Sequence, residues 1–161
     1  MVPYRKIFEE LEKRRIKYLV AGGLAVNFHK VQRITVDLDL ILHLQPKNVM
    51  AFVEMMTCLG YQSRLPVNAL DFANPKIRQR WITEKGMLVF SFIHPSNPFE
   101  LVDIFIKEPR PFKDLWRRRL EISISDATIY VIGKKDLMAM KKIAGRPKDL
   151  FDLAELKKQK D

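Results

Sequence analysis

The chain has 161 residues, of which 47% are hydrophobic and 30% charged, so it is long enough and apolar enough to form one folded domain with its own core. It contains no apolar run of membrane-spanning length and no apolar signal-peptide core, and its one cysteine, Cys58, excludes an intramolecular disulfide and a cysteine-rich zinc site. The formal net charge of +10 favours a polyanionic partner such as nucleic acid, although a solubility requirement or an acidic protein partner would also account for it.

These features predict a cytoplasmic, single-domain protein over residues 1–161 with no membrane partner. We expect its core at about 18–132 and a helical C-terminal segment at 133–161. The first predicted element is an amphipathic helix at residues 3–15. Pro3 is suited to its first turn, and one apolar stripe is formed by Tyr4, Ile7, Phe8 and Leu11.

A short, apolar and β-prone run at residues 18–21 leads directly into Gly22 and Gly23. Paired glycines allow a sharp turn and let backbone N–H groups approach a ligand closely. Residues 24–31 have the character of a helix, so these N–H groups would stand at a helix N-terminus, which favours phosphate. The pattern predicts a phosphate-binding turn at the two glycines.

Residues 33–42 alternate with a period of two, which predicts a strand. One face carries apolar side chains, and the other carries Arg33, Thr35, Asp37 and Asp39. Two carboxylates at positions i and i+2 of a strand lie roughly 6.6 Å apart along the backbone and repel each other, which indicates a bound cation. Hard ions such as Mg²⁺ take carboxylate oxygens and leave room for substrate phosphates. The simpler alternative is a half-exposed antiparallel strand whose polar face happens to carry aspartate.

The rest of the chain continues the alternation of helices and strands, which favours an α/β sheet over a helical bundle. The expected segments are, in order, a helix at 47–59 after Pro46, an irregular stretch at 61–75, a segment at 76–84 that fits either a helix or a strand, β runs at 87–93 and 99–106, a short helix within 109–119, two strands within 122–132, a helix at 134–144, and a second helix from Pro147.

Two aspartates outside the central stretch are conspicuous. Asp103 lies within an otherwise apolar β run, where a carboxylate is costly unless it is paired or binds a metal. A structural salt bridge or hydrogen bond is the competing explanation. Asp149 lies in the first turn of the last helix, where capping and the helix dipole alone would favour it.

The Gly-Gly turn followed by Arg-x-Thr-x-Asp-Leu-Asp-Leu resembles the signature of the nucleotidyltransferase fold shared with DNA polymerase beta. The chain looks most similar to small prokaryotic proteins related to the AbiEii-type toxins, whose C-terminal motif resembles the segment from Lys141 through Gly-Arg-Pro-Lys-Asp to Asp152. The resemblance covers about residues 18–153 and implies an α/β (α+β) nucleotidyltransferase fold, a mixed β-sheet flanked by helices with C-terminal helices. Many relatives are longer and carry further helical subdomains.

The resemblance also implies a set of site residues. Metal binding, by Mg²⁺ or Mn²⁺, falls to Asp37, Asp39 and Asp103. Nucleotide binding falls to Gly22, Gly23, Arg33, Thr35, Lys141, Arg146 and Asp149, with Lys142 as a register alternative to Lys141 and with an ion pair as the alternative role of Arg146. The catalytic residues are Asp37, Asp39, Asp103 and Lys141.

The implied activity is Mg²⁺-dependent transfer of NMP from a nucleoside triphosphate such as ATP to an acceptor hydroxyl. RNA or tRNA is the implied acceptor, and a toxin–antitoxin pair is the implied setting, with an antitoxin or a second copy of the chain as a partner. The alternatives are a degenerate domain that binds nucleotide or a partner without turnover, a metal-dependent phosphodiesterase or nuclease, and an RNA-binding module built on Trp81 and Arg117–Arg119. Because neither a Walker sequence nor Gly-x-Gly-x-x-Gly is present, P-loop and Rossmann folds are disfavoured.

Overall fold

The computed structural model describes residues 4–160, and within them seven strands form one mixed sheet in the order β3-β4-β5-β2-β1-β7-β6. The strands are β1 (Tyr18–Ala21), β2 (Leu38–Leu42), β3 (Gln62–Ser63), β4 (Val89–His94), β5 (Asn97–Phe105), β6 (Leu120–Ile124) and β7 (Ala127–Val131). The helices are α1 (Arg5–Lys13), α2 (Gly22–Phe28), α3 (Pro46–Cys58), the 3₁₀ helix η1 (Ala69–Ala73), α4 (Pro75–Lys85), α5 (Phe112–Arg117), α6 (Lys134–Ala144) and α7 (Pro147–Lys158). This is the mixed sheet with flanking helices that the resemblance to nucleotidyltransferases implies.

The order of the strands brings the glycine turn and two aspartates together. Strand β1 is antiparallel to β2, with Ala21 opposite Asp39. Strand β5 runs parallel to β2 on its other side, with Asp103 opposite Asp39. The turn at the end of β1 therefore lies at the same end of the sheet as an acidic pair, of which one member is on the adjacent strand β2 and the other on β5, one strand further away.

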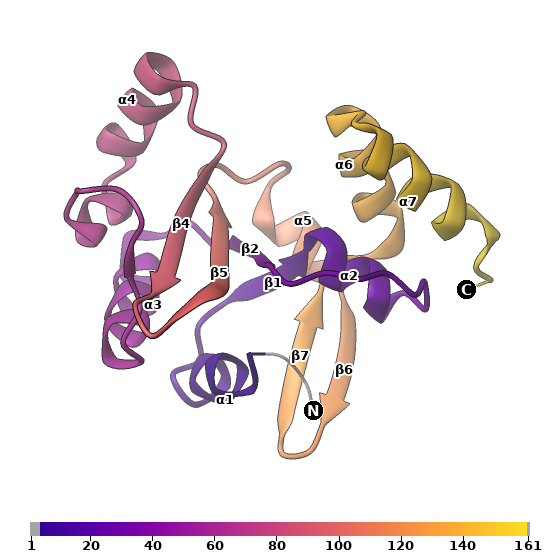
Figure 1. Ribbon diagram of the computed structural model, residues 1–161, viewed down its shortest axis with the longest axis horizontal. Helices are drawn as coiled ribbons and strands as arrows, with labels where there is room; N and C mark the ends of the chain where they lie inside the picture. The colour runs from indigo at the N-terminus through magenta and orange to yellow at the C-terminus, as the bar shows by residue number, and fades with distance from the viewer. Residues whose placement is uncertain (1–3, 161) are drawn as a thin grey trace.

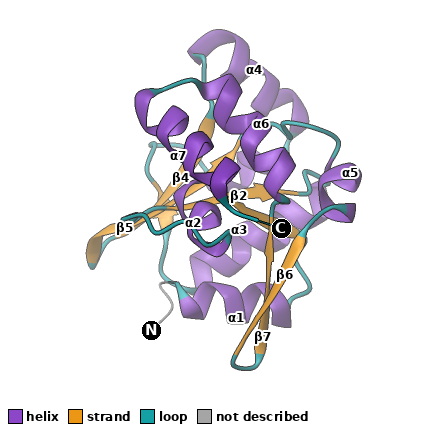
Figure 2. Ribbon diagram, turned by 90° about the vertical axis from the view of Figure 1, so that its right-hand side faces the viewer, coloured by secondary structure: helices purple, strands orange, loops and turns teal. Residues whose placement is uncertain are grey.

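Aromatic side chains from the helices pack against strand β4, near one edge of the sheet. Phe90 of β4 stacks against Phe72 of η1 and Trp81 of α4, with ring centroids 5.0 and 5.5 Å apart. Phe92 of the same strand meets Phe52 of α3 at 5.8 Å. Figure 1 shows α3, η1 and α4 gathered at this end of the molecule and α6 and α7 at the other. Both views show the β6–β7 hairpin projecting past the other strands of the sheet beside α1 (Figures 1 and 2).

The strand expected at 33–42 is shorter than predicted, because only Leu38–Leu42 is paired. Strand β1 ends at Ala21, opposite Asp39, and the chain then turns into α2, so residues 33–37 have no ladder partner in β1. Ile34 and Val36 are consequently 97% and 63% exposed rather than buried on one face of a strand.

Other segments follow the predicted order closely, and α6 has the predicted bounds. The undecided segment at 76–84 is helical, since Asn74 accepts a hydrogen bond from the backbone of Lys76 (2.9 Å) and caps α4. The stretch expected to be irregular at 61–75 contains β3 and η1. The expected first-turn position of Pro3 lies outside the described residues. No helix within residues 4–160 combines the length and apolarity that crossing a bilayer requires.

Candidate active site

The centre of the candidate site is a pair of carboxylates on adjacent parallel strands. Asp39 and Asp103 are register partners, and neighbouring strands lie about 4.8 Å apart. Asp37 stands two residues before Asp39, in the extended segment that leads into β2. The structure thus brings the three predicted acids to one end of the β2–β5 pair, and all three side chains are only partly exposed.

The two glycines are required by their surroundings. Gly22 has φ +61°, and a Cβ atom there would lie 2.0 Å from Oδ2 of Asp39. A Cβ at Gly23 would lie 2.7 Å from Oγ1 of Thr35 and 3.4 Å from Cζ of Arg33. The turn therefore packs its backbone directly against one predicted metal ligand and two predicted nucleotide-binding side chains.

Burial and neighbouring charge make ionisation of Asp39 unfavourable. Its pKa is raised from 3.8 to about 6, first by burial and then by the negative charges of Asp103 and Asp37. The cations Lys141 and Lys148 act in the opposite direction. A cation that binds beside Asp39 would therefore stabilise the ionised form of its carboxylate.

The environment of Asp103 is similar but less severe. Burial raises its pKa, a hydrogen bond from Ser91 lowers it, the charge of Asp37 raises it and the charge of Arg64 lowers it, with a net increase. The Ser91 hydroxyl donates to Oδ1 of Asp103 over 2.5 Å, from the opposing position of β4. Ser91 was missed by sequence reasoning, because only the β4–β5 register reveals that it faces the acid.

Among residues 4–160, no group of three His, Cys, Asp or Glu side chains is arranged so that it could hold a metal ion. The acids do fit the chemistry of a hard divalent cation, since Mg²⁺ is commonly held by one or two carboxylates together with substrate phosphates and water. The pKa of Asp39 is raised first by burial and then by repulsion from Asp103 and Asp37, and such an ion would relieve that repulsion.

The C-terminal site residues form a buried ion cluster. The side chain of Lys141 is 8% exposed, and its Nζ lies 3.3 Å from Asp149 and 2.9 Å from Asp152. Asp152 also pairs with Arg33, and Asp149 pairs with Arg146 over 2.6 Å. Burial alone would raise the pKa of Asp149, but hydrogen bonds from Arg146 and Lys141 outweigh it and hold the pKa below its ordinary value.

Two of these residues also have structural roles. Asp149 accepts a hydrogen bond from the backbone N–H of Arg146 (3.2 Å), which caps α7 as the first-turn position predicts. Arg146 has the acidic partner that the sequence offered as its alternative role.

A further contact ties the N-terminal helix to the acidic segment. The Tyr4 hydroxyl donates to the carbonyl of Val36 and lies 3.3 Å from the carbonyl of Leu101, so it joins the residue before Asp37 to β5. Burial raises the pKa of Tyr4 to about 12, and the nearby Asp37, Glu100 and Asp39 act in the same direction. Tyr4 was expected only as core packing, because its spacing in the sequence matches the apolar stripe of α1.

The features that suggested an RNA-binding module have structural partners instead. Trp81 is 7% exposed and packs on Phe90, as expected for a core residue. Of the arginine triplet, Arg118 is bound bidentately by Asp136, and Arg119 lies 4.0 Å above the ring of Trp116.

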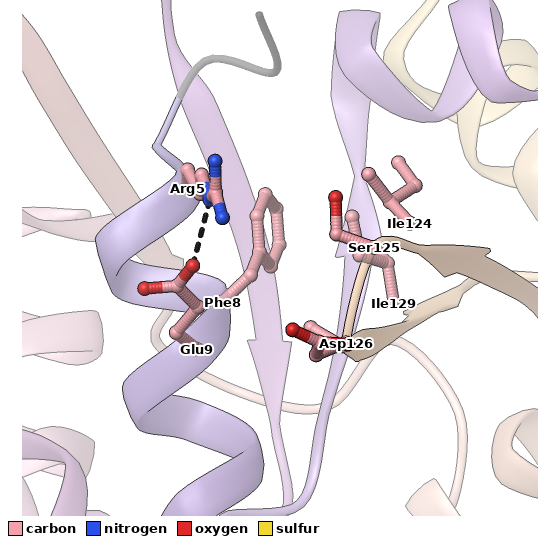
Figure 3. Close-up of a pocket in the computed structure, with 8 residues that line it drawn as sticks. Arg5, Phe8, Glu9, Ile124, Ser125, Asp126 and Ile129 are labelled. Atoms are coloured by element: carbon pink, nitrogen blue, oxygen red, sulfur yellow. Dashed lines mark hydrogen bonds and ion pairs between the residues drawn. The ribbon is translucent and has the colours of Figure 1, made fainter.

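A small hollow of about 20 Å³ between α1 and the β6–β7 turn contains none of the predicted site residues. Figure 3 shows Phe8 facing Ile129 and Ile124 across it, with the Arg5–Glu9 ion pair at its rim. We assign it no function.

The sequence matches no family model, and it matches no curated protein. Solved structures nevertheless share its fold. The lincomycin-bound lincosamide antibiotic adenylyltransferase LnuA is 17% identical, with a TM-score of 0.64 over 96% of this chain and 94% of that one. ANT(2″)-Ia in complex with adenylyl-2″-tobramycin is 14% identical, with a TM-score of 0.59 over 94% and 83% of the two chains.

A third similar structure is an antigenic nucleotidyltransferase-like protein from Paracoccidioides brasiliensis, 13% identical, with a TM-score of 0.57 over 94% of this chain and 72% of that one. At these identities the likeness shows the fold alone, and that fold is the one found in nucleotidyltransferases. None of the three is named as an AbiEii-type protein, so the narrower resemblance stays a prediction.

Proposed function

We propose that this protein is a nucleotidyltransferase that transfers NMP from a nucleoside triphosphate to an acceptor hydroxyl. The observation that carries the proposal is the register of Asp39 with Asp103 beside a turn whose glycines leave no room for a side chain. The likeness to LnuA, an adenylyltransferase, and to ANT(2″)-Ia, whose structure contains adenylyl-2″-tobramycin, supports the same class of reaction.

In the proposed reaction the acceptor oxygen forms a bond to the α-phosphorus, the bond to the bridging oxygen breaks, and pyrophosphate leaves. Asp103 takes the proton of the acceptor hydroxyl. Its raised pKa suits it to this role, because a general base works best when its pKa approaches the working pH. Since Ser91 occupies Oδ1, we assign the proton to Oδ2.

The triphosphate is proposed to lie over the glycine turn, beside the cations Arg33 and Lys141. These side chains would balance the negative charge that develops on the leaving pyrophosphate. Asp37 and Asp39 would hold Mg²⁺ or Mn²⁺, which supplies charge neutralisation at the phosphates when bound.

The acceptor that we propose is RNA, in keeping with the net charge of +10 and the resemblance to toxins that act on tRNA. A toxin role with an antitoxin partner belongs to the same proposal. Small hydroxylated molecules are the competing acceptors, because the names of two similar structures include lincomycin and adenylyl-2″-tobramycin.

The test is label transfer from each α-³²P-NTP in the presence of Mg²⁺, with total RNA, lincomycin or tobramycin as acceptor. Wild type is compared with the double variant Asp37→Ala/Asp39→Ala, and Asp126→Ala on the exposed β6–β7 turn is the matched control. We expect label in RNA from one nucleotide, retained in the control and lost in the double variant. If label appears in lincomycin or tobramycin instead of RNA, the proposed RNA acceptor is wrong. If no acceptor is labelled, transfer to all of these compounds is refuted.

A second candidate function follows from the acids themselves. Among the described residues no three acids are arranged to hold a metal ion, which is what a degenerate domain that binds nucleotide without turnover would show. Mg²⁺-dependent nucleotide binding in calorimetry, together with no transfer of label, would favour this function. Release of nucleotides from RNA without any NTP would indicate a phosphodiesterase instead.

A further inference from the structure

The side chain of Arg33 is held in place by a residue far away in the sequence. Its guanidinium lies against the glycine turn, with Cζ 3.4 Å from where a Cβ of Gly23 would stand. Its Nη1 pairs with Oδ2 of Asp152, which lies on α7, 119 residues along the chain. The side chain of Arg33 is 21% exposed, whereas that of Asp152 is 2% exposed.

Asp152 is a buried carboxylate shared by two cations. The same Oδ2 atom that accepts from Arg33 lies 2.9 Å from Nζ of Lys141. Both cations lie close enough to compensate the negative charge of this buried carboxylate. Lys141 has a second partner in Asp149, at 3.3 Å, whereas Asp152 is the carboxylate that holds Arg33.

We propose that Asp152 is a positioning residue, which holds the Arg33 guanidinium against the glycine turn so that it meets the triphosphate without reorganisation. This inference rests on the proposed nucleotide site, and it assigns to α7 a role beyond packing. Without the negative charge, Arg33 is no longer attracted into a region that also contains the Lys141 cation, and it turns toward solvent. The ordering of its side chain then becomes a cost of binding the ligand.

The test measures binding of inorganic tripolyphosphate with Mg²⁺ by calorimetry, because this probe contains the phosphates without a base whose identity is unknown. Asp152→Asn keeps the shape and removes the charge, and we expect about tenfold weaker binding, as for loss of one charge-assisted hydrogen bond. Arg33→Ala is expected to weaken binding by the same factor. If Asp152 acts through Arg33, the double variant binds no more than about twofold more weakly than Arg33→Ala alone.

The matched control is Glu155→Gln, which removes a carboxylate from the same helix, where it pairs with the exposed Lys158 at 2.7 Å. Its affinity should equal that of wild type. Melting temperatures of all variants separate loss of fold from loss of binding, since a purely structural role for Asp152 would lower the melting temperature and leave the affinity of the folded protein unchanged.

Where Asp152→Asn alone fails to fold, the same change is made in the charge-balancing background Lys141→Met and compared with Lys141→Met alone. Wild-type affinity of Asp152→Asn, equal affinity of these two background variants, or a double variant about a hundredfold weaker than wild type would each overturn the inference. Absence of binding by the wild-type protein to tripolyphosphate and to every NTP would instead overturn the proposed nucleotide site, and the inference with it.

Discussion

Replacing Asp39 with asparagine should stabilise the metal-free protein at neutral pH while abolishing activity. The folded state raises the pKa of this carboxyl from 3.8 to about 6, so it binds the proton more tightly than the unfolded chain does. Ionisation therefore lowers the free energy of unfolding as pH rises through the window from about 4 to 6. A change of one in pKa corresponds to about 1.4 kcal/mol, so the cost at pH 7.5 is at most about 3 kcal/mol.

Asparagine removes this cost because it has no charge to desolvate. We expect Asp39→Asn to be about 1–3 kcal/mol more stable than wild type in urea denaturation with EDTA at pH 7.5. At pH 4.5 the gap should shrink to about one third, because most Asp39 carboxyls are then protonated in the folded state. Addition of Mg²⁺ should stabilise wild type alone.

The matched control is Asp126→Asn on the exposed β6–β7 turn, for which we expect a change within about 0.5 kcal/mol. A variant at position 39 that is less stable than wild type at pH 7.5 would show that the carboxylate is already compensated in the folded protein. A gap that is the same at both pH values would exclude ionisation as its cause.

Two further pairs of variants test the geometry. Gly22→Ala should lower the free energy of unfolding by about 2–4 kcal/mol, and with it the melting temperature, because its Cβ would lie 2.0 Å from the carboxylate of Asp39. Gly86 has nearly the same backbone angle, φ +59°, but a Cβ there would have no atom within 4 Å. Gly86→Ala should therefore cost only about 1–2 kcal/mol. Arg118→Ala should lower the free energy of unfolding in urea denaturation more than Arg117→Ala does, because Asp136, whose side chain is 6% exposed, loses its bidentate partner. Arg117→Ala breaks an exposed ion pair and should change the free energy of unfolding by less than about 1 kcal/mol, and equal losses in the two arginine variants would contradict this reasoning.

Much of the fold was predictable because the local signals agree with the final structure. The helix at Lys134–Ala144 is bounded by glycines at both ends, and Gly145 has φ +63°, the conformation in which glycine ends a helix. The prediction was wrong for residues 33–37, where the alternating pattern continues but the partner strand has already ended. A β-strand forms only where a second strand supplies hydrogen-bond partners. The residue pattern of one segment does not predict whether such a partner strand lies beside it.

The same reason explains which parts of the site were missed. The acids and glycines of the central stretch are recognisable because they are close in sequence. Ser91, Tyr4 and the Asp152–Arg33 pair reach the site through strand register or helix docking, over separations of 12 to 119 residues. Such contacts leave no spacing to detect in a single sequence.

The separation between Arg33 and Asp152 also has a consequence during synthesis. The glycine turn and the first two acids are synthesised early, but the carboxylate that holds Arg33 belongs to α7. The parallel neighbours of β1 and β2, which are β7 and β5, are also synthesised later. Pairings between distant segments form slowly, since the chain between them must first be closed into a loop. A ribosome-bound chain would therefore carry the glycines and acids without the Arg33–Asp152 contact, and the proposed phosphate site would be ordered only after α7 had left the exit tunnel.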